Sequence, residues 1–372
     1  MCDFDYITAH VLSEFEEQMK LTRQPKVWHG EGDVYTHTLM VVDALHQLPE
    51  YALLSQRQKH IMNIAALLHD IGKVKTTVNV GREVEAPHHA PVGSRMAREL
   101  LWKRFGMCGK VEQMQAREAI CLLIRYHSFP PHAIDMDGCK LRMHRIASNS
   151  LLVPDFNIHL LCLLSKADML GRKCDDRQQM LEQIEMCEEL AKEEGCLAGC
   201  YTFPSNTTRR AYLSGQEVWK EQDIFDDTWG EVILMSGLPG TGKDTWIARN
   251  IPDLPMISLD EIRHERKISP TAAQGMVANI AREQAKEYLR RRQPFVWNAT
   301  NITTQLRDSL VNLCETYHAS VRIVYLETEM ETLLERNVAR QYSVPLYVIE
   351  SMLAKLVPPE PHEARQVEWI CV

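Results

Sequence analysis

The stretch EVILMSGLPGTGKDTW, residues 231–246, decides the fold of the C-terminal half of the chain. An apolar run typical of a buried strand is followed by Gly237, Gly240 and Gly242, and then by Lys243 at the start of a helical pattern. Glycines in such a loop let backbone N–H groups converge on a phosphate, and the lysine adds a positive charge. The stretch therefore predicts a phosphate-binding loop between a strand and a helix.

The residues around this stretch alternate between two patterns. Short apolar runs predict strands at 231–236, 295–299 and 321–326. Helical spacing of apolar residues occurs near 243–250, 271–292, 303–317, 329–341 and 345–356. This alternation is typical of βαβ units, so we expect an α/β domain with a parallel sheet at residues 230–372.

The N-terminal half has a different pattern, because its apolar residues recur at spacings of three and four. The helical segments are 36–48, 58–71, 92–105, 111–126, 157–170 and 177–194. They predict an all-α helical bundle at residues 1–200. Residues 201–229 turn irregular, and we expect an interdomain linker whose Arg209 and Arg210 either touch substrate or face solvent.

The composition is that of a globular protein, since the 372 residues are 45% hydrophobic and 25% charged. A net charge of −8 argues against bulk electrostatic binding of long nucleic acid, but not against binding a nucleic-acid end. The 11 cysteines form no CxxC pair, so we expect reduced thiols. Neither a membrane-spanning stretch nor a signal peptide is recognisable, which predicts a cytoplasmic protein without membrane contact.

Residues 61–73, IMNIAALLHDIGK, combine an apolar helix with a His-Asp doublet. A carboxylate is disfavoured at the C-terminal end of a helix and is costly to bury unpaired, so Asp70 needs a positive partner such as a divalent cation. Further candidate ligands are His69, His37, His127, Asp168, and one of the neighbours His88 and His89. Imidazole nitrogens mixed with carboxylate oxygens suit one or two ions of Mn, Fe, Co, Ni or Zn rather than Ca.

These residues, together with H-x-x-x-G from His89 to Gly93, resemble the HD-domain phosphohydrolase superfamily over roughly residues 25–175. The resemblance implies a first metal held by His37, His69, Asp70 and Asp168, and a second held by Asp70, His89 and His127. It favours His89 over His88 because of the glycine four residues later. It also implies phosphoester hydrolysis, since paired ions activate water and stabilise the attacking and leaving oxygens.

Basic residues near the doublet and near Asp168 are open to two interpretations. Lys73 either offers a positive charge to phosphoryl oxygens or is a lysine favoured at a helix terminus. Arg172 and Lys173 are interpreted as a solvated turn without a role.

Two pairs of charged residues follow the glycine-rich loop. Asp260 and Arg263, three apart, form either an exposed ion pair or the base and the cation that a kinase needs at its acceptor hydroxyl. Arg336 and Arg340 lie four apart on a predicted helix, where like charges are best explained by an anion above them. The alternative is that they are solvated, or that Arg336 pairs with Glu331 or Glu335.

The second half, about residues 230–365, resembles the polynucleotide kinase family of P-loop phosphotransferases. The resemblance implies Asp260 as base, Arg263 as acceptor clamp, and Lys243, Arg336 and Arg340 as charge stabilisers. The nucleotide would contact Gly237, Gly240, Thr241, Gly242, Lys243, Asp244, Thr245, Arg336 and Arg340, with Mg²⁺ as cofactor.

Two positions depart from the pattern of that family. Asp244 stands where a Ser or Thr normally holds Mg²⁺, with Thr245 one residue later. Asn298 stands where related kinases commonly have Asp. Since an amide cannot neutralise Mg²⁺, Asp244 is hypothesised to be the compensating carboxylate.

Taken together, the two halves resemble the bacterial HD-domain polynucleotide kinases. This implies transfer of phosphate from ATP or another NTP to a 5′-hydroxyl of RNA or DNA, and removal of a 2′,3′-cyclic or 2′-phosphate, with ligation left to a separate ligase. One alternative is a nucleoside or nucleotide kinase fused to a nucleotide phosphohydrolase. Another is a regulatory module whose HD half binds metal or nucleotide without turnover.

Overall fold

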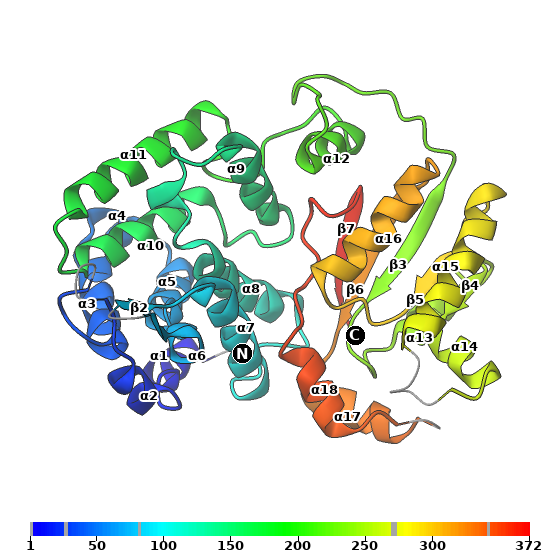
Figure 1. Ribbon diagram of the computed structural model, residues 1–372, viewed down its shortest axis with the longest axis horizontal. Helices are drawn as coiled ribbons and strands as arrows, with labels where there is room; N and C mark the ends of the chain where they lie inside the picture. Colours follow the sequence, from blue (N-terminus) through cyan, green and yellow to red (C-terminus); the bar gives the residue numbers. More distant parts are fainter. Residues whose placement is uncertain (1–2, 26–28, 81–82, 269–273, 341–342) are drawn as a thin grey trace. The chain divides into compact units, whose positions relative to one another are not determined.

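The computed structural model describes residues 3–25, 29–80, 83–268, 274–340 and 343–372. The chain folds into two compact units, which are Met1–Met107 with Glu112–Tyr201, and Cys108–Val111 with Thr202–Val372 (Figure 1). Every cysteine in the described ranges is a free thiol, as expected. No helix in these ranges is both long and apolar enough to cross a bilayer.

The first unit is helical, and all six predicted helices are confirmed. They are α3 (Val34–Gln47), α5 (Gln56–Leu68), α7 (His89–Lys103), α8 (Val111–Tyr126), α10 (Ile158–Leu170) and α11 (Arg177–Glu193). The shorter helices are α1 (Phe4–His10), α2 (Glu16–Leu21), α4 (Pro49–Leu53), α6 (Lys73–Thr76) and α9 (Cys139–Ser148), with 3₁₀ turns at Pro130–His132 and Asn149–Leu151. A small antiparallel hairpin, β1 (Val78–Val80) with β2 (Glu83–Glu85), was not expected.

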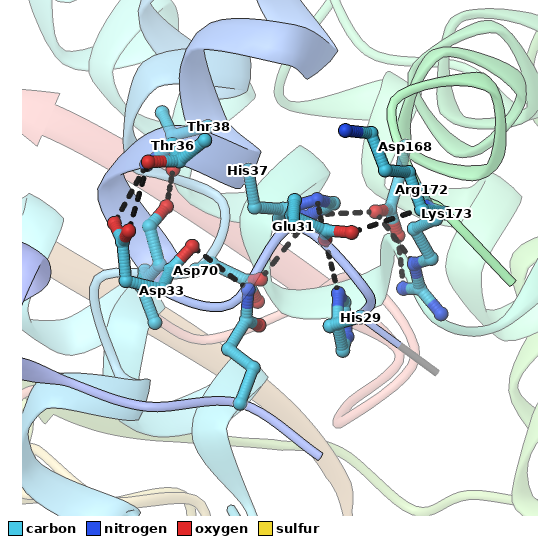
Figure 2. Close-up of polar contacts among 12 residues, drawn as sticks. His29, Glu31, Asp33, Thr36, His37, Thr38, Asp70, Asp168, Arg172 and Lys173 are labelled. Atoms are coloured by element: carbon cyan, nitrogen blue, oxygen red, sulfur yellow. Dashed lines mark hydrogen bonds and ion pairs between the residues drawn. The ribbon is translucent and has the colours of Figure 1, made fainter. Parts of the chain in front are cut away.

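Side-chain caps fix where the functional helices begin. The Asp33 carboxylate accepts hydrogen bonds from the backbone N–H and the hydroxyl of Thr36 and so starts α3 (Figure 2). Ser55 and Gln58 form a capping box at α5. The expected helix 58–71 ends earlier, at Leu68, so the His-Asp doublet lies in the turn beyond it.

The second unit is α/β, which confirms the predicted class. Its parallel sheet has the order β4 (Met256–Ser258), β5 (Val296–Asn298), β3 (Glu231–Ser236), β6 (Ser320–Glu327) and β7 (Gln366–Cys371). Its helices are α12 (Asn206–Ser214), α13 (Lys243–Asn250), α14 (Leu259–Glu265), α15 (Gln274–Arg290), α16 (Thr304–Thr316), α17 (Met330–Val338) and α18 (Leu346–Leu353). The strands β4 and β7 were not predicted.

The central strand β3 is buried on both faces because its side chains alternate between two helix layers. Ile233 and Met235 pack in a core cluster with Ile247 of α13. Val232 and Leu234 face the opposite way, where they line a small cavity with residues of α15 and α16. The C-terminal end of β3 therefore delivers the glycine-rich loop to one edge of a rigid sheet.

The segment expected as a linker, residues 201–229, contains α12, which belongs to the second unit. Arg210 makes a bidentate contact with the Glu315 carboxylate at 2.7 and 2.9 Å and donates to the His362 carbonyl at 2.6 Å. Arg209 donates to the Arg365 carbonyl at 2.8 Å. Both arginines thus attach α12 to the unit, which neither of the two interpretations above foresaw.

Candidate active sites

Four histidines and two aspartates from separate elements of the first unit converge in one buried cluster. His37 lies on α3, His69 and Asp70 follow α5, His89 opens α7, His127 follows α8, and Asp168 lies on α10. These are the six predicted ligands. His88, the alternative to His89, is exposed and has a positive φ of 57°.

Asp70 joins two groups of ligand atoms through its two carboxylate oxygens. Its Oδ2 lies 3.6 Å from His37 Nε2 and 3.4 Å from His69 Nε2. Its Oδ1 lies 3.5 Å from His89 Nε2 and 3.9 Å from His127 Nε2. Asp168 joins the first group, with Oδ1 3.0 Å from His37 Nε2. The geometry matches two adjacent ion sites with Asp70 between them.

Three of these histidines are oriented in the same way. His69, His89 and His127 each donate Nδ1–H to the backbone carbonyl three residues earlier, at 2.7, 2.9 and 2.8 Å. In the neutral form of such a ring, Nε2 is an acceptor, and here each Nε2 faces a carboxylate. Asp70 Oδ1 is buried and receives no hydrogen bond from the described residues. Lone pairs that face lone pairs in a buried site call for a cation, so these residues fit the metal ions that the resemblance implies.

The electrostatics agree with this assignment for two of the rings but not for His37, whose pKa is raised because hydrogen bonds to Asp168 and Glu31 outweigh burial. Burial lowers the pKa of His127 to about 3 and also lowers the pKa of His89, so both rings are neutral, as metal ligation requires. Burial opposes ionisation of Asp70 and Asp168, but the charges of Lys73 and Arg172 outweigh it and hold both pKa values well below the usual range.

The His37 ring is held by a carboxylate that the sequence analysis missed. Glu31 Oε1 lies 3.0 Å from His37 Nδ1 and 2.8 Å from His29 Nδ1 (Figure 2). A carboxylate behind a ligating histidine fixes the ring orientation and raises its basicity. The only signal in the sequence is an acidic residue in a loop just before a ligand-bearing helix.

A cavity of about 340 Å³ opens beside His89 and His127. Lys73 lines it and pairs with Asp70 Oδ2 at 2.7 Å and with Gln24 Oε1 at 2.6 Å. Arg172 also lines it and contacts both oxygens of Asp168, at 3.0 and 2.5 Å, so it is not part of a solvated turn as interpreted. With Arg23, the cavity wall carries three cationic side chains, and the carboxylates Glu85 and Asp176 also line it.

The glycine-rich loop of the second unit lies between β3 and α13, as predicted. Gly240 and Gly242 both have φ of +84°, and a Cβ on Gly240 would lie 2.7 Å from the Leu333 carbonyl oxygen. Lys243 Nζ donates to the carbonyls of Gly237 and Leu238 at 3.0 and 2.9 Å. Burial lowers the pKa of Lys243 to about 8. Carbonyl groups of its own loop therefore hold the Lys243 ammonium group.

Most of the predicted kinase residues line one cavity of about 480 Å³. They are Gly240, Gly242, Lys243, Asp244, Thr245, Asp260, Arg263, Arg336 and Arg340. Arg340 Nη2 lies 3.3 Å from Asp260 Oδ2, so the predicted base and the predicted lid arginine contact each other. Gly237 and Thr241 are not brought to the cavity wall, since the Gly237 N–H donates to the Thr300 carbonyl and the Thr241 hydroxyl donates to the Leu238 carbonyl.

Each half of the chain is similar to a known protein family. The family model described as HD domain matches residues 34–170, and the one described as AAA domain matches residues 232–359. The chain is also 24% identical over 136 residues to the L-seryl-tRNA(Sec) kinase of Methanococcus maripaludis, which covers 34% of this chain and 53% of that protein. The chain thus spans about half the length of this curated relative. The protein joins an HD domain to a P-loop, kinase-like domain.

Proposed function

We propose that this protein heals nucleic-acid ends, with an NTP-dependent 5′-hydroxyl kinase in the second unit and a metal-dependent phosphohydrolase in the first. The observation that carries the proposal is the presence in one chain of two cavities built for phosphate chemistry. One contains Lys243 and the candidate acceptor residues Asp260 and Arg263. The other borders the histidine and aspartate cluster.

In the kinase site, Asp260 accepts the proton of the acceptor hydroxyl as its oxygen attacks the γ-phosphorus of ATP or another NTP. The bond from the γ-phosphorus to the β,γ-bridging oxygen breaks, and the nucleoside diphosphate leaves. Lys243, Arg336 and Arg340 stabilise the charge on the transferred group, and Arg263 holds the phosphate next to the acceptor. Arg340 Nη2 also contacts the Asp260 carboxylate, at 3.3 Å.

In the HD site, His37, His69, Asp70 and Asp168 would hold one transition-metal ion, and Asp70, His89 and His127 a second. Such ions supply Lewis acidity and lower the pKa of water at neutral pH. Lys73 and Arg172 orient the phosphoryl oxygens of a 2′,3′-cyclic or 2′-phosphate end from the cavity wall. Glu31 keeps His37 in place during the reaction.

The most specific part of the proposal is the identity of the hydroxyl group that accepts the phosphate. The relative from Methanococcus maripaludis is, by its name, a kinase that acts on a tRNA-borne residue, which favours an RNA-linked hydroxyl over a free nucleoside. Both ends of a broken RNA, a 5′-hydroxyl and a cyclic phosphate, would match the two sites. A separate ligase would then join the healed ends.

End-labelling tests both halves at once. We offer γ-labelled ATP, Mg²⁺ and Mn²⁺ with an oligonucleotide that carries a 5′-hydroxyl and a 2′,3′-cyclic phosphate. Asp260→Ala should lower 5′-labelling by about 10²–10⁴-fold and leave removal of the cyclic phosphate intact. Asp70→Asn, which keeps the side-chain shape, should do the reverse. Asp253→Asn, at an exposed carboxylate outside the cavity, is the matched control.

The proposal fails in defined ways. A free nucleoside phosphorylated as fast as the oligonucleotide would instead indicate the nucleoside kinase alternative. Cyclic-phosphate removal that survives both His69→Ala and Asp70→Asn would indicate a metal-binding regulatory HD domain.

A further inference from the structure

The two positions that depart from the usual P-loop kinase pattern contact each other. Asn298 Nδ2 donates a hydrogen bond of 2.6 Å to Asp244 Oδ1. Asn298 ends the strand β5, whereas Asp244 lies 54 residues earlier in the first turn of α13. The described residues make no other hydrogen bond or ion pair with Asp244, so its second oxygen is available to a ligand.

Both residues line the cavity that contains Lys243, and they differ in exposure. Asp244 is open to the cavity, whereas Asn298 is buried. In P-loop enzymes the ion is usually held by a neutral hydroxyl after the lysine and by an aspartate at a strand end. The present pair has the same total charge, but the negative charge has moved from the strand to the residue that follows Lys243.

We infer that Asp244, oriented by Asn298, is the carboxylate ligand of the nucleotide-bound divalent cation, and that this placement makes nucleotide binding depend on the cation. The inference rests on the kinase part of the proposed function. A hydroxyl after the lysine tolerates a metal-free triphosphate, because it carries no charge. A carboxylate at the same place repels the phosphates until a cation lies between them. The site therefore selects the metal complex and rejects the free nucleotide.

Binding of a non-hydrolysable ATP analogue to the full chain tests this inference without a turnover readout. Calorimetric titrations in Mg²⁺ and in EDTA give a ratio of dissociation constants. For the wild type we expect binding about 100-fold tighter in Mg²⁺. For Asp244→Ser, which restores the usual hydroxyl, we expect a ratio of about tenfold or less, mainly because binding in EDTA improves.

Two control variants show how much of the measured binding, and of its dependence on Mg²⁺, belongs to the P-loop. Lys243→Ala removes binding at the P-loop, and whatever binding remains belongs elsewhere in the chain and is subtracted. Asp253→Ser changes an exposed carboxylate of the same unit that does not line the cavity, and it should keep the wild-type ratio.

The contact with Asn298 is tested by a double-mutant cycle. Asn298→Asp alone puts two carboxylates in contact and should weaken binding in EDTA further. Combined with Asp244→Ser, it returns the usual pattern, and the double variant should bind Mg²⁺-nucleotide at least about threefold more tightly than the product of the single effects predicts. Independent effects would overturn the positioning role of Asn298.

The inference is overturned if Asp244→Ser keeps the wild-type ratio, or if the wild type binds equally well with and without Mg²⁺. Neither result depends on the acceptor. A ratio that collapses in Asp244→Ser while no 5′-hydroxyl oligonucleotide is phosphorylated would uphold the inference and refute the proposed substrate.

Discussion

Gly72 occupies a place in which no side chain fits. A Cβ there would lie 2.0 Å from the His89 carbonyl oxygen and 2.7 Å from the Gly93 nitrogen. Its φ of −61° is ordinary, so the residue is needed for close approach rather than for an unusual backbone conformation. In the sequence, Gly93 is the glycine of the H-x-x-x-G motif that begins at His89. In the structure, Gly93 and Gly72 let α7 lie against the turn that carries Asp70, which places His89 beside its carboxylate.

Gly72→Ala should displace the start of α7 and separate His89 from Asp70. We expect a destabilisation of about 1–3 kcal/mol, typical of overpacking, with loss of the second metal ion and of hydrolase activity. Metal content and phosphatase assays measure the effect, and kinase activity should persist. Gly275→Ala is the matched control, because nothing lies within 4 Å of a Cβ at that position. A fully loaded, active Gly72→Ala protein would contradict the packing argument.

Residue types and spacing could predict which histidine and aspartate side chains converge, but not which residues orient them. A His-Asp doublet at the end of an apolar helix is informative because an unpaired buried carboxylate is costly. Glu31 and Gln24 lie in a polar loop without periodicity, so nothing in the sequence connects them to His37 or Lys73. The contact between Asp244 and Asn298 likewise depends on how β5 is placed beside β3, and this register is set by tertiary packing.

At the scale of elements, α7 and α8 are joined by a buried charged cluster. Glu118 contacts Arg98 Nε at 2.9 and 3.0 Å and Arg98 Nη2 at 2.7 Å, and Arg117 Nε at 2.9 Å. All three side chains are buried. Burial opposes ionisation of Glu118, but the two guanidinium groups hold its pKa below the usual value.

A folded-state pKa below the unfolded value adds stability above the unfolded pKa, and this contribution is lost as the pH falls. Glu118→Gln should therefore cost about 3–5 kcal/mol at pH 7, and its difference from wild type should shrink toward pH 4. Urea unfolding at pH 7, 5.5 and 4 measures both proteins. Glu112→Gln, at an exposed position on the same helix, should cost little at any pH. A difference independent of pH would contradict the assignment.

The long, periodic elements could be predicted from the sequence, whereas most of the short ones could not. Helices such as α8 and α10 show several turns of apolar spacing, and this pattern can be recognised in the sequence alone. The strand β4 is as short as the predicted β5, but it lacks the apolar run Phe-Val-Trp that marks residues 295–297. The strand β7 follows a Pro-rich segment and is defined by pairing with β6, a contact between distant parts of the chain. Likewise, α12 was missed because its sequence is mostly polar, although Ser205 caps its start and Gly215, with a φ of 90°, ends it.

At the scale of the whole molecule, the two units should respond differently to loss of metal. The ligand atoms of the cluster face one another, and all of its side chains are buried except the partly buried His89, so removing a cation leaves mutual repulsion in the core of the first unit. A ligand present at 1,000 times its dissociation constant stabilises the folded state by about 4 kcal/mol.

Dialysis against a chelator should therefore destabilise the first unit by up to this amount and leave the second unit unchanged. Hydrogen exchange resolved by segment measures this destabilisation. We expect faster exchange in α3, α5 and α10, and an unchanged exchange rate in β3 and β6. Asp70→Asn should abolish the response. Equal exchange with and without chelator would mean that the cluster holds no stabilising ion.

The attachment of α12 decides where the molecule can be cut. A C-terminal half that started at Glu231 would lose Arg209 and Arg210, and with them the partners of Glu315 and of two carbonyls in the stretch that leads into β7. A half that started at Thr202 would keep them. Separate production of the second unit should hence succeed from Thr202 rather than from Glu231, because the contacts of α12 help to hold that unit together.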